Sequence, residues 1–179
     1  MIPAQQSTHE IHPIDGGALR HVCAHFATGV TVITTGLPGD SSGTTVNSFT
    51  SVSLEPPLVL FCLHQHSRLL PLLKESGGFV VNFLTRQQQS LAYAFAGRES
   101  ADLTGVPHHR TQEGLPVLSE ALAHLTCRLV EEYDGGDHTI LLGRVVGLGA
   151  EEKPIDDPLI FYRGAMRELG GPVTVPPRS

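Results

Sequence analysis

The sequence has no excess of basic residues and no long apolar segment. Its 179 residues include 12 Lys and Arg against 18 Asp and Glu, a formal net charge of -6. This balance argues against a dedicated nucleic-acid binder, because such proteins normally carry a clustered basic excess. The apolar run at 58–63 is only six residues long, whereas a membrane span needs about 20. We therefore expect no nucleic-acid partner and no membrane segment.

Cysteine is scarce as well, and the first residues do not resemble an export signal. Cys23, Cys62 and Cys127 lie far apart and form no CxxC pair. Residues 1–15 are polar, without the apolar stretch that follows a basic start in a signal peptide. These features favour reduced thiols and a cytoplasmic location. The largely apolar neighbours of the cysteines predict small buried side chains.

Common cofactor and metal motifs are also missing. No GxGxxG follows a predicted strand and no GxxxxGK[ST] occurs, which argues against a Rossmann domain and a P-loop. The pairs His21–His25 and His64–His66 could each supply two metal ligands, but no CxxC or HExxH supplies a third. We therefore expect no metal site.

Glycine and proline, in contrast, are plentiful, with 19 and 13 residues. Together with short runs rich in β-branched residues, they predict many turns and a mainly β fold. We expect strands at 30–35, 44–54, 58–63, 79–84, 122–133, 138–148 and 159–162, a hairpin loop at 36–43, and an irregular stretch at 103–116. Helices are expected at 67–74, at 87–95, and in a segment that Asp15 caps and whose apolar stripe should be buried.

No regular βαβ order runs through these elements, so a partly closed antiparallel barrel with peripheral helices fits best. Residues 15–169 should form one domain. Residues 1–14 are expected to be a flexible N-terminal arm, and residues 170–179 a flexible C-terminal tail.

One predicted strand is unusually rich in polar side chains. Seven hydroxyl or amide groups fall within ten residues: Thr44, Thr45, Asn47, Ser48, Thr50, Ser51 and Ser53. This pattern fits either a Ser/Thr-rich strand with one solvated face, or a site for a polar planar ligand whose phosphate approaches backbone N–H groups near Gly43. The pattern alone slightly favours the first. His138, at the start of a strand, either projects into a cleft or caps the hairpin.

Several segments, in order, resemble the small NAD(P)H:flavin reductases that serve two-component flavin-dependent monooxygenases and have the FMN-binding split-barrel fold. The similar segments are FATGVTVITT (26–35), NSFTSVSLEPPLVLFCL (47–63), FVVNFL (79–84), LAYAFAG (91–97), GGDHTILLGRV (135–145) and PLIFYRG (158–164). The resemblance covers most of the chain, from Leu19 to Leu169.

The resemblance implies roles for particular residues. Those implied to hold the flavin are Ser41, Ser42, Gly43, Thr44, Thr45, Asn47, Ser48, Cys62, Leu63, His64, Ser67, Arg68, Leu69, Ala94 and Phe95. Ser67, Arg68 and Leu69 match the segment at the flavin phosphate, where a guanidinium can bind two oxygens at once. Those implied to lie at the nicotinamide nucleotide are His138, Phe161, Tyr162 and Arg163, with His138 as the catalytic candidate.

The resemblance also implies the reaction. FAD or FMN would accept hydride at N5 from C4 of NADH or NADPH, and the reduced flavin would pass to a separate monooxygenase. A homodimer is expected, because an incomplete barrel exposes strand surface that needs covering. Two alternatives are a flavoprotein that keeps its FMN and reduces another substrate itself, and a non-catalytic flavin-binding partner subunit.

Overall fold

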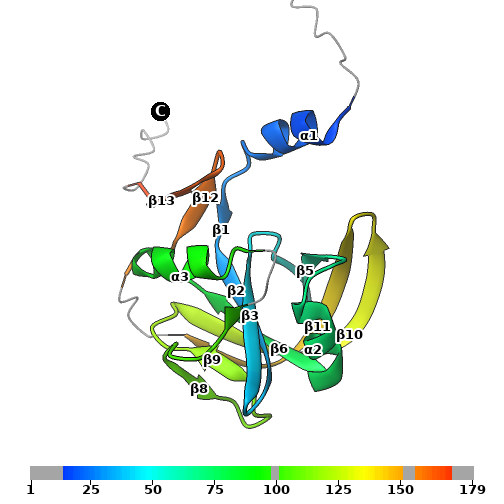
Figure 1. Ribbon diagram of the computed structural model, residues 1–179, viewed down its shortest axis with the longest axis vertical. Helices are drawn as coiled ribbons and strands as arrows, with labels where there is room; N and C mark the ends of the chain where they lie inside the picture. The colour runs from blue at the N-terminus through cyan, green and yellow to red at the C-terminus, as the bar shows by residue number, and fades with distance from the viewer. Residues whose placement is uncertain (1–13, 98–100, 151–155, 171–179) are drawn as a thin grey trace, which may run out of the picture.

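The computed structural model describes residues 14–97, 101–150 and 156–170 (Figure 1). Its helices are α1 (Gly16–Cys23), α2 (Leu69–Ser76), α3 (Gln89–Ala94) and the 3-10 turn η1 (Arg86–Gln88). Its strands are β1 (Thr28–Gly29), β2 (Thr31–Leu37), β3 (Asp40–Val46), β4 (Thr50–Leu54), β5 (Pro57–His64), β6 (Gly78–Phe83), β7 (Ala101–Asp102), β8 (His108–Arg110), β9 (Pro116–Leu118), β10 (Ala123–Gly135), β11 (His138–Ala150), β12 (Ile160–Tyr162) and β13 (Ala165–Arg167). Apart from Ile14 and Gly170, the predicted arm and tail lie outside the described residues.

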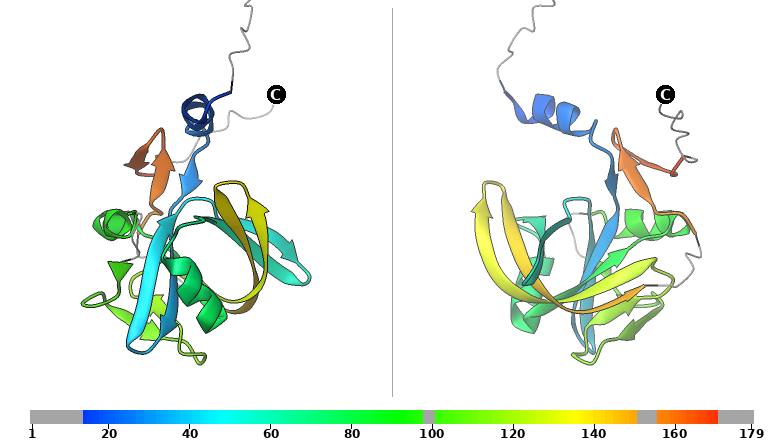
Figure 2. Two further views of the ribbon diagram at one scale, coloured as in Figure 1. Left: turned by 45° about the vertical axis from the view of Figure 1, so that its right-hand side comes forward. Right: turned by 180° about the vertical axis from the view of Figure 1, so that it is seen from behind.

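An eight-stranded antiparallel sheet forms the body of the protein, in the order β4-β5-β11-β10-β6-β2-β3-β7. The sheet curls but does not pair its two edge strands, so the barrel is only partly closed. Helix α2 lies between the β2–β3 hairpin and the β10–β11 hairpin, as the left view of Figure 2 shows. The predicted fold class, a mainly β split barrel with peripheral helices, is confirmed.

Alternation along the strands builds the core. In β5, Phe61 and Leu63 are buried, while the intervening Cys62 is half-buried on the opposite face. Phe61 packs edge-to-face on Phe79 of β6, with ring centroids 4.9 Å apart. Leu73 of α2 joins the same cluster, and each such side chain contributes about 1.5–3 kcal/mol through burial.

The prediction of a hairpin loop over 36–43 is correct only for its two central residues. Strands β2 and β3 pair up to Leu37 and Asp40, so only Pro38 and Gly39 form the turn. This pairing with β2 extends the strand through polar residues of low strand propensity, and Ser42 also pairs with Asp102 of β7 on its other side. Ser41, Ser42 and Gly43 are therefore strand residues.

The single strand expected at 44–54 is also wrong, because it divides into β3 and β4. The link between them, residues 47–49, separates two strands with different neighbours: β3 pairs with β2, and β4 pairs with β5. The stretch at 103–116, expected to be irregular, contains β8, which pairs with β9. Each of these pairings joins two strands that follow one another along the chain.

The apolar stripe of the first helix is exposed, which contradicts the prediction that it is buried. Asp15 caps α1 as expected, accepting a hydrogen bond from the Ala18 backbone N–H at 2.7 Å. Val22 and Phe26, however, are 68% and 76% exposed, because the helix extends away from the barrel (Figure 2). Cys23 is exposed for the same reason, so its predicted burial is wrong.

The other two cysteines lie inside the barrel wall. Cys62 is half-buried and Cys127 is buried, and burial raises the pKa of the Cys127 thiol to about 12. Within the described residues, no helix is long and apolar enough to cross a membrane.

Candidate functional site

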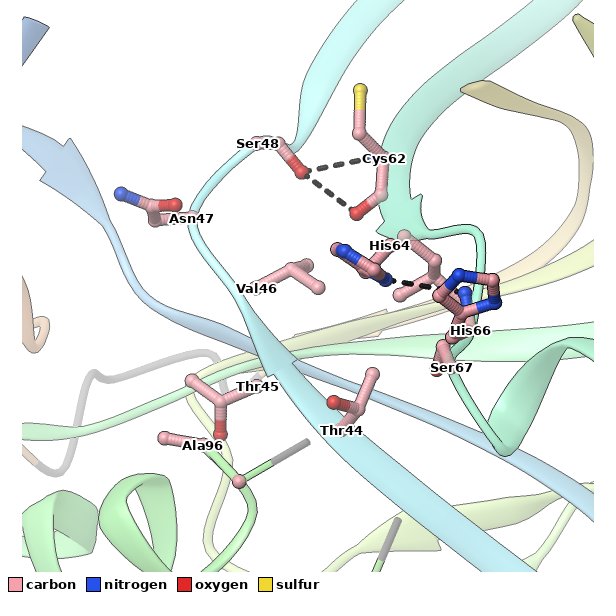
Figure 3. A pocket seen from close by; sticks show the side chains of 12 residues that line it. Thr44, Thr45, Val46, Asn47, Ser48, Cys62, His64, His66, Ser67 and Ala96 are labelled. Atoms are coloured by element: carbon pink, nitrogen blue, oxygen red, sulfur yellow. Dashed lines mark hydrogen bonds between the residues drawn. The ribbon is translucent and has the colours of Figure 1, made fainter. Parts of the chain in front are cut away.

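A cavity of about 330 Å³ opens where β3 ends and β5 leads into α2 (Figure 3). The lining residues are Thr44, Thr45, Val46, Asn47, Ser48, Cys62, Leu63, His64, His66, Ser67, Ala96 and Gly97. They come from β3 and the link after it, from the end of β5 and the loop after it, and from the turn after α3. The volume falls at the lower end of the range for small-molecule sites.

The first wall of the cavity is β3, which α3 holds in place. Thr45 Oγ1 donates to the Ala92 carbonyl at 2.8 Å, and the Thr45 backbone N–H donates to the Phe95 carbonyl at 2.9 Å. Thr44 Oγ1 reaches the same Phe95 carbonyl at 3.4 Å. These bonds place the small residues that follow Phe95 against the cavity.

The second wall depends on one serine. Ser48 Oγ accepts a hydrogen bond from the Cys62 backbone N–H at 2.9 Å and donates to the Cys62 carbonyl at 3.3 Å. Beyond the end of β3, the Ser48 side chain thus pairs with backbone groups of β5 as a neighbouring strand would, and Figure 3 shows both bonds. The hydroxyl holds the 47–49 link beside β5, and the exposed Asn47 amide lies on that link.

Three histidines lie close together at this end of the cavity lining, two of them, His64 and His66, in the lining itself. His64 and His138 are directly opposite each other on β5 and β11, with ring centroids 5.5 Å apart. His66 lies next to His64, with ring centroids 5.3 Å apart. His138 Nδ1 is 2.7 Å from Asp137 Oδ1. That hydrogen bond, and then the charge of His138, lower the pKa of the Asp137 carboxyl.

The structure brings together about half of the predicted flavin-site residues. Those that line the cavity are Thr44, Thr45, Asn47, Ser48, Cys62, Leu63, His64 and Ser67. Ser42 and Arg68 line a neighbouring hollow beside α2, one step further along β3. Four more of the predicted residues line neither hollow and pack next to the residues that do. Leu69 and Phe95 belong to the core, Ala94 ends α3, and Gly43 packs so tightly on Phe95 that an added Cβ would lie 3.0 Å from its ring.

Ser41 lines the same neighbouring hollow as Ser42 and Arg68. Its hydroxyl donates to the Leu37 carbonyl at 2.9 Å and accepts from Arg110 at 2.8 Å. These bonds give Ser41 a structural role within the hairpin. Its place in flavin binding stays a prediction.

The residues predicted to lie at the nicotinamide are found in different parts of the structure. Phe161 lines a smaller, mostly apolar hollow of about 160 Å³, which shares Thr45, Val46 and Asn47 with the main cavity. Arg163 instead donates to His25 Nε2 at 3.0 Å, next to α1, and its guanidinium lies 5.9 Å from the Tyr162 ring centre. A role in nicotinamide binding stays a prediction for all of them.

Four cavity residues were not among the predicted ones: Val46, His66, Ala96 and Gly97. His66 was visible as half of a histidine pair, and Ala96–Gly97 as the small-residue turn that ends a helix. Val46 gave no signal, because an apolar residue in a strand is ordinary. Across the described ranges, no three His, Cys, Asp or Glu side chains are grouped to hold an ion.

Comparison with known proteins gives the same class as the fold and the cavity. The model of the flavin reductase like domain matches residues 23–170. The reductase subunit HsaB of a flavin-dependent monooxygenase from Rhodococcus jostii is 40% identical over 163 residues, which are 91% of this chain and 83% of that protein.

Two solved structures agree closely with this one. Nitrilotriacetate monooxygenase component B from Mycobacterium thermoresistibile superposes with a TM-score of 0.83 at 36% identity, covering 91% of each chain. The NADH:FAD oxidoreductase SgcE6 of Streptomyces globisporus, solved with NAD and FAD fragments, gives a TM-score of 0.79 at 37% identity, covering 89% of this chain and 97% of that one.

The fold and site thus define a split-barrel oxidoreductase. More particularly, the chain belongs to the flavin reductase like domain family.

Proposed function

We propose that this protein catalyses the NAD(P)H-dependent reduction of free FAD or FMN and supplies the reduced flavin to a separate monooxygenase. The observation that carries the proposal is the cavity between β3 and the end of β5, in a chain of this family. One wall offers hydroxyl, amide and backbone groups, and Val46 and Leu63 add apolar surface. This combination suits a flat ring system with a polar edge.

A flavin held in this cavity would supply the redox chemistry, as the acceptor of hydride from the nicotinamide. The chain's own task is to bind and orient, and it needs no strong general base. Asn47 presents an exposed amide at the cavity edge, and Val46 and Leu63 exclude water from one wall. Arg68 follows the loop at the cavity and offers a guanidinium for phosphate oxygens.

His138 is the residue we assign to the nicotinamide side. It lies beside His64, which lines the cavity, and Asp137 fixes its ring through Nδ1. Its Nε2 is then the nitrogen available for an incoming nucleotide. This position supports a role in orienting the hydride donor.

We infer that a second copy of the chain completes the molecule. The sheet leaves β4 as an unpaired edge, with Leu54 89% exposed, and Leu148 on β11 is 76% exposed. The apolar stripe of α1, with Val22 and Phe26, has no cover within the described part of the chain. Apolar surface of this kind marks an interface more often than a free surface. The free thiols, including the exposed Cys23, support a reducing compartment such as the cytoplasm.

A spectrophotometric assay tests the proposal. Purified protein should oxidise NADH or NADPH continuously when excess FAD, FMN or riboflavin is added, and the relative rates identify the preferred pair. A protein that stays yellow on purification and ignores added flavin would instead reduce another substrate with its own FMN. A protein that binds flavin but oxidises neither nicotinamide would be a non-catalytic partner subunit.

A further inference from the structure

The loop after β5 and the turn between β10 and β11 lie next to each other, beyond the last residues that the strands pair. His64 and His138 are the final pair of β5 with β11, and Gly135 and His138 are the final pair of β10 with β11. Neither ladder extends further, so other contacts set the position of the turn. We refer to residues 134–137 as the hairpin turn.

One residue, Gln65, ties the hairpin turn to the end of β5. Its backbone N–H donates to the Asp137 carbonyl at 3.0 Å, and its side-chain amide donates to the Gly136 carbonyl. The turn's own bond, from the Gly136 N–H to Asp134 Oδ1 at 3.0 Å, lies within the turn and holds it to no other element. Because Gly135 and Gly136 leave the backbone many conformations, the two bonds from Gln65 restrict the turn where its own residues do not.

The hairpin turn leads directly into His138, which the proposed function places on the nicotinamide side. Asp137 Oδ1 is 2.7 Å from His138 Nδ1, so the direction of the His138 ring follows the position of Asp137. On the other side of Gln65, the rings of His64 and His66 lie at the cavity wall, as Figure 3 shows. Gln65 is not itself among the residues that line this cavity. It therefore acts on the site only through its neighbours.

We propose that Gln65 is a positioning residue for hydride transfer. By holding the hairpin turn against the end of β5, it keeps His138 in one orientation toward the hydride donor. Orientation matters because a small misplacement of a positioning group can cost about 100-fold in rate. The side chain of Gln65 is exposed, so its role lies in fixing the turn and not in building the core. The inference rests on the proposed function, because it concerns the nicotinamide side of the same site.

Gln65→Met tests the proposal, because methionine is of similar length and offers no N–H donor. The bond to the Gly136 carbonyl is lost, whereas the backbone bond to Asp137 is kept. We expect kcat/KM for NADH or NADPH to fall about three- to tenfold, the range that one hydrogen bond supplies. The Kd of the flavin, measured by equilibrium dialysis without nicotinamide, should stay the same, and the urea midpoint should change little.

Hydrogen exchange gives a readout that does not depend on turnover. In the flavin-free protein, the backbone amides of residues 135–137 should exchange faster in Gln65→Met than in the unchanged protein. Gln112→Met is the matched control, because Gln112 is an exposed glutamine between β8 and β9 and lies outside the cavity. It should alter neither the exchange of the hairpin turn nor kcat/KM.

A double variant shows whether Gln65 acts through His138. His138→Ala already lacks the ring that Gln65 orients, so adding Gln65→Met to it should slow flavin reduction no further. Two effects that multiply would show that Gln65 acts independently of His138, and would overturn the proposal.

Three other results would also overturn it. These are an unchanged kcat/KM in Gln65→Met, slower turnover without faster exchange of the hairpin turn, and a flavin Kd that rises as much as kcat/KM falls. The last would place the effect at the cavity wall. In each case the unchanged protein still reduces flavin, so the proposed function stands. No oxidation of NADH or NADPH by the unchanged protein would instead remove the proposed function, and the role of Gln65 with it.

Discussion

Ser48→Ala should weaken both the fold and flavin binding, because one hydroxyl connects two segments. The variant loses the acceptor for the Cys62 N–H at 2.9 Å and the weaker bond to the Cys62 carbonyl at 3.3 Å. A half-buried donor left without its partner costs about 1–2 kcal/mol. The shorter bond should account for most of this loss, since the longer one exceeds the usual range.

Urea unfolding at fixed protein concentration measures the loss, since association would make stability depend on concentration. With an m value of about 2 kcal/mol/M, the midpoint should fall by roughly 0.5–1 M. Ser51→Ala, the same change at an exposed position of β4, is the matched control and should shift it little. Flavin affinity should drop only in Ser48→Ala, because the 47–49 link forms a cavity wall. Equal midpoints for the two variants would refute the bridging role of this hydroxyl.

Four further changes test other parts of the molecule. Arg68→Ala should weaken FAD or FMN binding by about tenfold and leave riboflavin binding unchanged, if its guanidinium contacts phosphate; an unaltered Kd for all three would count against it. His138→Ala should slow NADH-dependent flavin reduction more than it weakens flavin binding, and unchanged rates would reject that role. Because the pKa of Asp137 is lowered in the folded protein, the charged carboxylate stabilises the fold above about pH 4, and this stabilisation is lost as the pH falls through the pKa of the folded state. Asp137→Asn should therefore lose less unfolding free energy on acidification than the unchanged protein does. Urea unfolding at neutral and at acidic pH measures this difference. Val22→Asp combined with Phe26→Asp should dissociate the inferred dimer in sedimentation experiments, and an unchanged sedimentation coefficient would show that α1 is not the interface.

The polar side chains of β3 and of the link after it have different roles, which composition could not show. Seven hydroxyl or amide groups within ten residues favoured either a solvated strand face or a ligand site. In the folded chain, the hydroxyls of Thr45 and Ser48 are bonded to backbone groups of α3 and β5. They hold the walls of the cavity, and Asn47, on the link after β3, presents its amide at the cavity edge. The hydrogen bonds of Thr45 and Ser48 thus give part of the pattern a structural role, and ligand binding by this segment stays a prediction.

Predictions from the sequence were most accurate for elements that neighbouring residues specify. The long strands at 122–133 and 138–148 are found as β10 and β11, because their alternation and the Asp-Gly-rich turn between them specify a hairpin without outside help. The Asp15 cap was likewise readable, since it depends only on the residues that follow it. The resemblance then gave the order of the site segments along the chain.

By itself, the sequence determined the fold class, the family, and the set of segments from which the site is built, because strand periodicity, turn residues and the family motifs are local and survive in one dimension. Only the tertiary structure decided which residues line the cavity, because that depends on which strands pair. Pairing of residues 40–43 with β2 made a strand of most of the expected loop, and the pairing of His64 with His138 brought together residues 74 positions apart. The exposure of Val22 and Phe26 was decided in the same way: periodicity gives the apolar side of a helix, and the rest of the molecule supplies, or withholds, the surface that covers it.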